Sequence, residues 1–227
     1  MGKRALIIVG FLLAILILAE LLSLLQLRAS LTTNAEYWQQ RSSEPGELTY
    51  VALGDSTAQG IGARQPDKGY VGVLADRLAT KTGKSIRVVN LSVSGARIRD
   101  VIDKQIPQLK DYSPDFITIE AGANDVVKYD AKKFANDFQE LAELIPPNTV
   151  VANMPYFGGR ISRDTQIKSA NGIVAESAIK NDLLVVDLYT YTKVGDTPFN
   201  YAADLFHPSN RGYRNWADAF WTKLKDL

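Results

Sequence analysis

The sequence predicts a three-layer α/β/α domain around a sheet of about five parallel strands, preceded by an N-terminal membrane-spanning helix. Over residues 47–227, short runs rich in apolar and β-branched residues alternate with longer stretches of helical periodicity. The short runs lack the strict alternation that marks a strand with one solvated face, so they suit parallel strands covered by helices on both faces. Ahead of this region, the chain opens with a long and almost uncharged apolar stretch.

Strands and helices are expected in regular alternation. The strands are expected at residues 48–53, 86–91, 116–120, 149–153 and 183–188, and the helices at residues 70–82, 98–110, 131–144, 162–180 and about 212–225. Successive βα units imply right-handed crossovers between parallel strands. In such sheets functional residues gather at the carboxyl ends of the strands, so these ends are where a site is expected.

The N-terminal stretch from Ala5 to Leu27 has 23 residues and a single charge, Glu20. As a helix it would be about 34 Å long, enough for a hydrocarbon core of about 30 Å. The basic residues Lys3 and Arg4 precede it, which favours a cytoplasmic N-terminus and an extracytoplasmic domain. A signal peptide cleaved after Ala35, giving a secreted protein, and a buried soluble helix remain alternatives.

These features divide the chain into a membrane anchor at residues 1–30, a linker at residues 31–46 and a folded domain at residues 47–227. The linker is expected because residues 31–46 are polar and show no clean periodicity. Contact with a membrane is accordingly expected through residues 5–27.

Composition excludes several kinds of chemistry. Lys and Arg total 26 against 25 for Asp and Glu, so no basic excess favours a nucleic acid partner. The chain has no Cys and one His. Disulfides, a thiolate nucleophile, Cys-ligated zinc and sites with several His ligands are therefore excluded, and no metal or cofactor is expected. The sequence carries no indication of the oligomeric state.

Chemically suggestive residues follow the expected strands. Ser56 follows the first strand in Gly54-Asp55-Ser56, Gly95 follows the second, Asn124 follows the third, and Asp204 stands three residues before His207 near the C-terminus. Each has an ordinary structural explanation by itself, as a helix cap, a turn glycine, a loop amide or a structural histidine. Their joint occurrence at successive strand ends favours a shared catalytic role.

In this order and spacing, the four groups resemble those of the SGNH hydrolases, also called the GDSL esterase/lipase family, over about residues 48–225. The resemblance implies a flavodoxin-like sheet, with Ser56 as nucleophile, His207 as general base and Asp204 orienting the imidazole. It also implies an oxyanion hole made of the backbone N–H groups of Ser56 and Gly95 and the side-chain amide of Asn124. One departure is Leu205, where family members often carry glycine.

The activity implied is hydrolysis of carboxylic esters through an acyl-enzyme on Ser56, with lysophospholipids, acyl esters or thioesters as substrates. A carbohydrate O-deacetylase acting on cell-envelope polysaccharide would use the same residues, and a catalytically silent binding domain is the alternative of another class. Tyr156, Phe157 and Phe206 are expected to contact the substrate. The aromatic-rich segment Tyr189–Ala203 is expected as a long loop that serves either as a lid or as a packed surface element.

Overall fold

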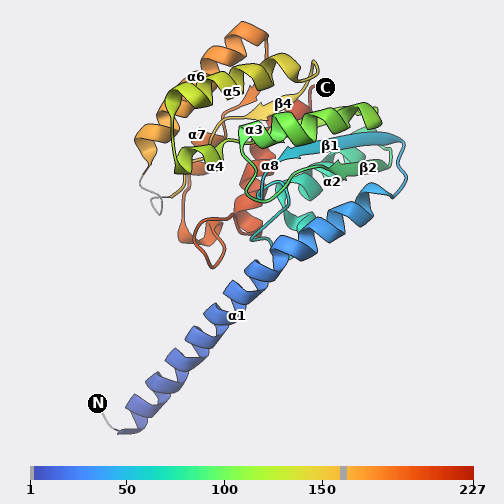
Figure 1. Cartoon of the computed structure of the whole chain (residues 1–227). Helices are drawn as coiled ribbons and strands as arrows, with labels where there is room; N and C mark the ends of the chain where they lie inside the picture. Colours follow the sequence, from blue (N-terminus) through green and yellow to red (C-terminus); the bar gives the residue numbers. More distant parts are fainter. Residues whose placement is uncertain (1–2, 159–162) are drawn as a thin grey trace.

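The computed structural model describes residues 3–158 and 163–227 (Figure 1). Within these residues the sheet has the strand order β2-β1-β3-β4-β5, with every neighbouring pair parallel. The strands are β1 (Leu48–Gly54), β2 (Ile86–Asn90), β3 (Phe116–Glu120), β4 (Val150–Ala152) and β5 (Leu184–Val186). This order is that of a flavodoxin-like sheet, so the predicted fold class is confirmed.

Helices cover both faces of the sheet and make three layers (Figure 1). One face packs against α2 (Tyr70–Thr82), α8 (Asn210–Leu224) and the C-terminal part of α1 (Lys3–Ser42). The other face packs against α5 (Ala131–Leu144) and α6 (Asp164–Asn181). Residues of β1 alternate between the two faces, because Tyr50 and Ala52 join the first core whereas Val51 and Leu53 join the second.

Local sequence accounts for the ends and faces of the helices. Asp130 caps α5 by accepting a hydrogen bond from the backbone N–H of Lys133 at 3.0 Å. Behind this cap, Phe134, Phe138 and Leu141 recur at helical spacing and are all buried against the sheet. The cap and this spacing predict a helix at residues 131–144, which the structure confirms.

Three connecting segments differ from the prediction. The expected helix at residues 98–110 consists of a helical turn α3 (Ile98–Asp100), a π-helical turn (Val101–Gln105) and a 3₁₀ segment (Ile106–Asp111). Pro107 lacks an N–H group and its ring crowds the preceding turn, which breaks regular α-helical bonding. A further short helix, α4 (Ala123–Val127), follows β3. The expected loop Tyr189–Ala203 contains most of α7 (Leu188–Lys193) and a 3₁₀ turn at Pro198–Asn200.

The predicted linker at residues 31–46 is wrong as a description of local structure, because α1 continues to Ser42. Ser30, Asn34 and Trp38 are buried on one side of this helix. Asn34 Nδ2 and Trp38 Nε1 both donate to the backbone carbonyl of Gln59, at 2.9 and 3.1 Å. The buried stripe is largely polar, so a search for hydrophobic periodicity does not find it.

The N-terminal part of α1 projects away from the domain (Figure 1). Between Ile7 and Leu25 its large apolar side chains are exposed. Among the described residues, α1 is the one helix long and apolar enough to cross a membrane, and a signal sequence would meet the same criteria.

Candidate active site

The turn that carries Ser56 depends on close packing at the end of β1. Gly54 has a φ of 142°, and a Cβ at this position would lie 2.1 Å from the carbonyl oxygen of Glu120. Only glycine allows this approach of β1 to β3. Gln105 holds the same residue, since its Oε1 accepts from the Gly54 N–H at 2.8 Å and its Nε2 donates to the Gly54 carbonyl at 2.9 Å. Sequence reasoning missed Gln105, which is 1% exposed.

The structure brings Ser56, His207 and Asp204 into one hydrogen-bonded series. Ser56 Oγ lies 2.9 Å from His207 Nε2, and His207 Nδ1 lies 2.6 Å from Asp204 Oδ2. The other carboxylate oxygen, Asp204 Oδ1, accepts from the backbone N–H groups of Phe206 and His207 at 2.9 and 3.0 Å. The series is anchored to the C-terminal helix, because Ser209 caps α8 two residues after His207.

The hydrogen bonds around Asp204 favour its charged form. Partial burial acts to raise the pKa of Asp204, but the hydrogen bonds from His207 and from the backbone of Phe206 outweigh it and hold the pKa below its ordinary value. Asp204 is thus a carboxylate at neutral pH. A carboxylate at Nδ1 favours the His207 tautomer that keeps its proton there, leaving Nε2 free to accept from Ser56.

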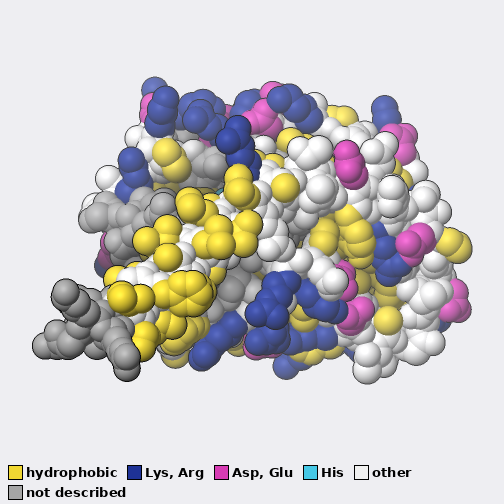
Figure 2. Space-filling model, turned by 90° about the horizontal axis from the view of Figure 1, so that it is seen from below, with side chains coloured by type: hydrophobic (Ala, Val, Ile, Leu, Met, Phe, Trp, Pro, Cys, Tyr) yellow, Lys and Arg dark blue, Asp and Glu magenta, His cyan; other side chains and the backbone are white. Residues whose placement is uncertain are grey.

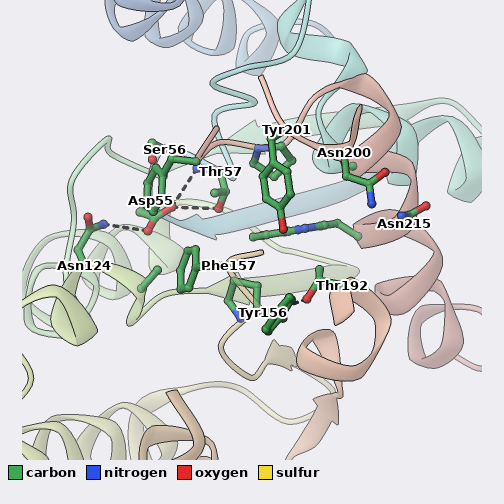
Figure 3. A pocket seen from close by; sticks show the side chains of 16 residues that line it. Asp55, Ser56, Thr57, Asn124, Tyr156, Phe157, Thr192, Asn200, Tyr201 and Asn215 are labelled. Atoms are coloured by element: carbon green, nitrogen blue, oxygen red, sulfur yellow. Dashed lines mark hydrogen bonds between the residues drawn. The ribbon is translucent and has the colours of Figure 1, made fainter. Parts of the chain in front are cut away.

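The loop that carries Gly95 lies against the Ser56 turn. The backbone N–H of Val93 donates to the Gly54 carbonyl at 3.1 Å, and Gly95 has a φ of 82°. Asn124, in the first turn of α4, donates from Nδ2 to the Ala96 carbonyl at 3.0 Å and to Asp55 Oδ2 at 2.9 Å (Figure 3). The three predicted oxyanion-hole residues therefore belong to segments that are hydrogen-bonded to one another. An oxyanion bound between these segments would therefore share the N–H donors of Asn124 Nδ2 with Asp55 and the Ala96 carbonyl.

Two buried carboxyl groups lie beneath this site, and sequence reasoning missed both. Asp55 Oδ1 accepts from the backbone N–H and the hydroxyl of Thr57, both at 2.9 Å, and the same hydroxyl contacts Glu120 Oε2. Burial raises the pKa of Asp55, and burial together with the charge of Asp55 raises the pKa of Glu120 well above its ordinary value.

Of the two carboxyl groups, Glu120 thus favours the proton more strongly, while Asp55 accepts hydrogen bonds from Thr57. A hydroxyl has only one hydrogen, so Thr57 can donate to only one of the two carboxyl groups. A protonated Glu120 that donates to Thr57, which in turn donates to Asp55, satisfies both contacts. This chain of hydrogen bonds ends at Asn124 and fixes the direction of its amide group.

A pocket opens beside Ser56 and Asn124 (Figure 3). All three predicted substrate contacts, Tyr156, Phe157 and Phe206, line it. The rings of Phe157 and Phe206 are stacked, with centroids 5.4 Å apart. Figure 3 shows Asn200 and Asn215 at the end of the pocket away from Asn124. The wall is thus aromatic near the serine and carries amide groups at its far end.

Sequence reasoning missed part of this wall. Trp216 belongs to α8, where its spacing indicates a core position, and Tyr201 lies in the segment predicted to be either a lid or a packed loop. The sequence also suggests the segment at residues 155–160, after β4, as a wall of the pocket, and residues 159–160 of this segment lie outside the described residues. Over residues 3–158 and 163–227, no group of three or more His, Asp and Glu side chains is arranged to hold a metal ion.

Comparison with known proteins places these features in a family. Residues 52–214 match the model of the GDSL-like lipase/acylhydrolase family. The Bacillus subtilis (strain 168) protein YpmR is 28% identical, in an alignment that covers 92% of this chain and 94% of YpmR.

Solved structures share the fold. A lipase/acylhydrolase from Enterococcus faecalis superimposes with a TM-score of 0.66 at 23% identity, covering 79% of this chain and 96% of that one. TesA gives a TM-score of 0.66 at 22% identity, over 78% and 98% of the two chains. Axe2, an acetylxylan esterase from Geobacillus stearothermophilus, gives 0.63 at 22% identity, over 78% and 94%. The chain belongs to the GDSL-like lipase/acylhydrolase family and is an ester-hydrolysing enzyme.

Proposed function

We propose that this chain is a membrane-anchored serine esterase that forms an acyl-enzyme on Ser56. The observation that carries the proposal is the hydrogen-bonded series from Ser56 through His207 to Asp204, with contacts of 2.9 and 2.6 Å. A serine hydroxyl is a weak nucleophile at neutral pH, so it needs a neighbouring base. His207 Nε2 lies within reach to accept the proton as the oxygen attacks.

In the proposed reaction, Ser56 Oγ bonds to the carbonyl carbon of the ester while its proton passes to His207 Nε2. Asp204 stabilises the resulting imidazolium without itself taking the proton. The backbone N–H groups of Ser56 and Gly95 and the amide of Asn124 donate to the developing oxyanion. His207 then protonates the leaving alcohol, and a water molecule activated by the same histidine hydrolyses the acyl-enzyme.

The aromatic wall formed by Tyr156, Phe157 and Phe206 supports an acyl group as the part of the substrate that the pocket holds. Lysophospholipids, acyl esters and acyl thioesters are the substrate classes proposed. Carbohydrate O-deacetylation is the second candidate activity, and the similarity of the fold to that of an acetylxylan esterase supports it. A silent binding domain is disfavoured, because binding alone does not require the complete series of nucleophile, base and acid.

We further propose that α1 stays attached as a single-pass anchor with the esterase domain outside the cytoplasm. Cleavage after Ala35 would remove Asn34 and with it the hydrogen bond to the Gln59 carbonyl. Residues 1–30 then form the anchor and residues 47–227 the catalytic domain, with the helix up to Ser42 packed on that domain. Secretion after cleavage of the apolar segment is the alternative.

A panel of p-nitrophenyl esters from acetate to palmitate tests the activity on the full chain in detergent. We expect Ser56→Ala and Asp204→Asn to lower kcat by about 10³–10⁶. Circular dichroism serves to verify that both variants fold. A folded Ser56→Ala variant that matched the wild-type rate would disprove the nucleophile assignment. The ratio of the rates on long-chain and acetyl esters separates the esterase from the O-deacetylase.

A further inference from the structure

The helix α1 runs past the sheet in the direction opposite to the strands. Its last residue, Ser42, accepts a hydrogen bond at 3.0 Å from Arg87, near the start of β2. Two turns earlier, Asn34 donates to the carbonyl of Gln59, in the segment that follows β1. The apolar half of α1 therefore projects from the edge at which the strands end, which is the edge that carries Ser56 (Figure 1).

Two loops at this edge of the sheet, around residues 62–64 and residues 202–203, lie beside the end of the apolar run of α1. A groove separates them from α1, and it is lined by Ser23, Gln26, Leu27, Ser30, Gly62, Ala63, Arg64, Ala202 and Ala203. Because the apolar run ends at Leu27, this part of α1 is where a spanning helix leaves the hydrocarbon and enters the headgroup layer. Ala202 and Ala203 directly precede Asp204, so the loop that carries Asp204 and His207 is held at the level of the headgroup layer.

The loop at residues 198–207 exposes two large apolar side chains. Leu205, between Asp204 and Phe206, is 51% exposed, and Phe199, near the start of the loop, is 76% exposed. Leu205 also has a φ of 53°, a conformation that is strained for a bulky L-residue and easy for glycine. Compared with glycine at position 205, leucine adds backbone strain and exposes apolar surface to water. A lipid environment would bury that surface.

Charge on the same face suits a lipid surface. Figure 2 views the molecule from the side on which α1 projects, and hydrophobic side chains follow the helix with Lys and Arg side chains beside it. Arg28 on α1 and Arg64 at the groove are both exposed. Basic side chains at the level of the headgroups are attracted to lipid phosphates.

We propose that the loop carrying Phe199 and Leu205 rests in the headgroup layer of the membrane that α1 crosses, and that the enzyme takes a long-chain ester from that bilayer. The inference rests on the proposed function of Ser56 and on the retention of α1. The bilayer is the occupant that fits, because the helix that enters it also fixes the height of the catalytic loop. The substrate class is accordingly a membrane lipid ester rather than a dissolved polymer.

The first test measures the position of the loop without using activity. The chain has no Cys, so Leu205→Cys, Phe199→Cys and Ile179→Cys each give a single site for an NBD fluorophore. Ile179 is the control, because it is 87% exposed near the C-terminal end of α6, which leads into the start of β5 at the opposite edge of the sheet. The full-length variants are reconstituted in vesicles of dioleoylphosphatidylcholine with and without doxyl-labelled lipid.

We expect doxyl lipid to quench the labels at positions 205 and 199 and to leave the label at position 179 unaffected. Equal and weak quenching at all three positions would overturn the proposed membrane contact. This readout is independent of the esterase assignment.

The second test compares hydrolysis of 4-methylumbelliferyl oleate in the same vesicles with hydrolysis of dissolved 4-methylumbelliferyl acetate. The double variant Phe199→Ser, Leu205→Gly removes both apolar side chains and relieves the strain at position 205. We expect it to lose about tenfold on the bilayer ester and to retain its rate on the acetate, while Ile179→Ser changes neither.

The outcomes of the second test separate the two proposals. Wild-type rates of the double variant on both esters would refute substrate uptake from the bilayer and leave the esterase intact. No hydrolysis by the wild-type chain, with labels 199 and 205 still quenched, would contradict the proposed function and support the membrane contact. Faster hydrolysis of dissolved acetyl xylan than of any vesicle ester would overturn the lipid assignment.

Discussion

A Cβ on Gly62 would lie 2.8 Å from the Cβ of His207 and 2.6 Å from the carbonyl oxygen of Pro208. The segment that follows Ser56 is therefore packed closely against the loop that carries His207. Gly62 also has a φ of 94°, which L side chains rarely adopt. The absence of a side chain at this position is what lets His207 sit beside Ser56.

Gly62→Ala is expected to displace His207 and to lower kcat by at least about tenfold while the fold persists. Gly83→Ala is the matched control, because Gly83 also has a positive φ but nothing lies within 4 Å of the added Cβ. Both variants are expected to lose about 1–2 kcal/mol of unfolding free energy through backbone strain, and Gly62→Ala is expected to lose more because its Cβ also meets the Pro208 carbonyl oxygen. Equal kcat values for the two variants would show that contact with His207 has no catalytic consequence.

Asn124→Ala is expected to lower kcat by about 10²–10³ with little change in KM, because an oxyanion donor acts in the transition state. Steady-state kinetics with a p-nitrophenyl ester measures both constants. A raised KM at an unchanged kcat would remove Asn124 from the oxyanion hole and assign it to substrate binding.

Glu120→Gln is expected to change how stability depends on pH. Burial raises the pKa of Glu120, so the folded chain holds a proton that the unfolded chain releases above its ordinary value of about 4.3. That contribution is fully present below the unfolded pKa and is lost as pH rises toward the raised folded value. The variant, which does not titrate, should show a flatter decline of unfolding free energy as the pH rises above the ordinary value.

Urea unfolding followed by tryptophan fluorescence measures this slope. Glu143→Gln, on the exposed side of α5, serves as the control substitution and should retain the wild-type decline. A wild-type slope in the Glu120→Gln variant would show that Glu120 is charged in the folded protein.

Trp38→Ala is expected to destabilise the domain by about 3–5 kcal/mol, because it empties a buried site and removes a hydrogen bond to the Gln59 carbonyl. Leu31→Ala, at an exposed position on the same helix, should cost far less. Thermal unfolding by circular dichroism compares the two. Equal melting temperatures would show that the C-terminal part of α1 is not needed by the fold.

The sequence predicted the elements whose signals are local. The apolar run of β3 was found with its exact bounds, and Ser56 was found because a short motif follows a strand directly. The order of the strands agrees with the flavodoxin-like sheet that the family resemblance implies. Pro107 marks the break within residues 98–110, but the helical spacing of the apolar residues around it favours a continuous helix.

Contacts between distant segments were not predictable in this way. Gln105 clamps Gly54 only because the segment at residues 101–105 packs under β1, and Gly62 matters only because His207 folds onto it. The C-terminal part of α1 is attached to the domain through Asn34 and Trp38. The buried side of this part is largely polar, so it gives no periodic hydrophobic signal. These features depend on the three-dimensional arrangement rather than on residue type.

The most direct measurement of the central claim is the mass of the full-length chain after exposure to a fluorophosphonate, with peptide mapping of the adduct. The account predicts one adduct, located on Ser56, in the wild-type chain and none in the Ser56→Ala variant. An adduct on another residue, or equal labelling of the Ser56→Ala variant, would contradict it.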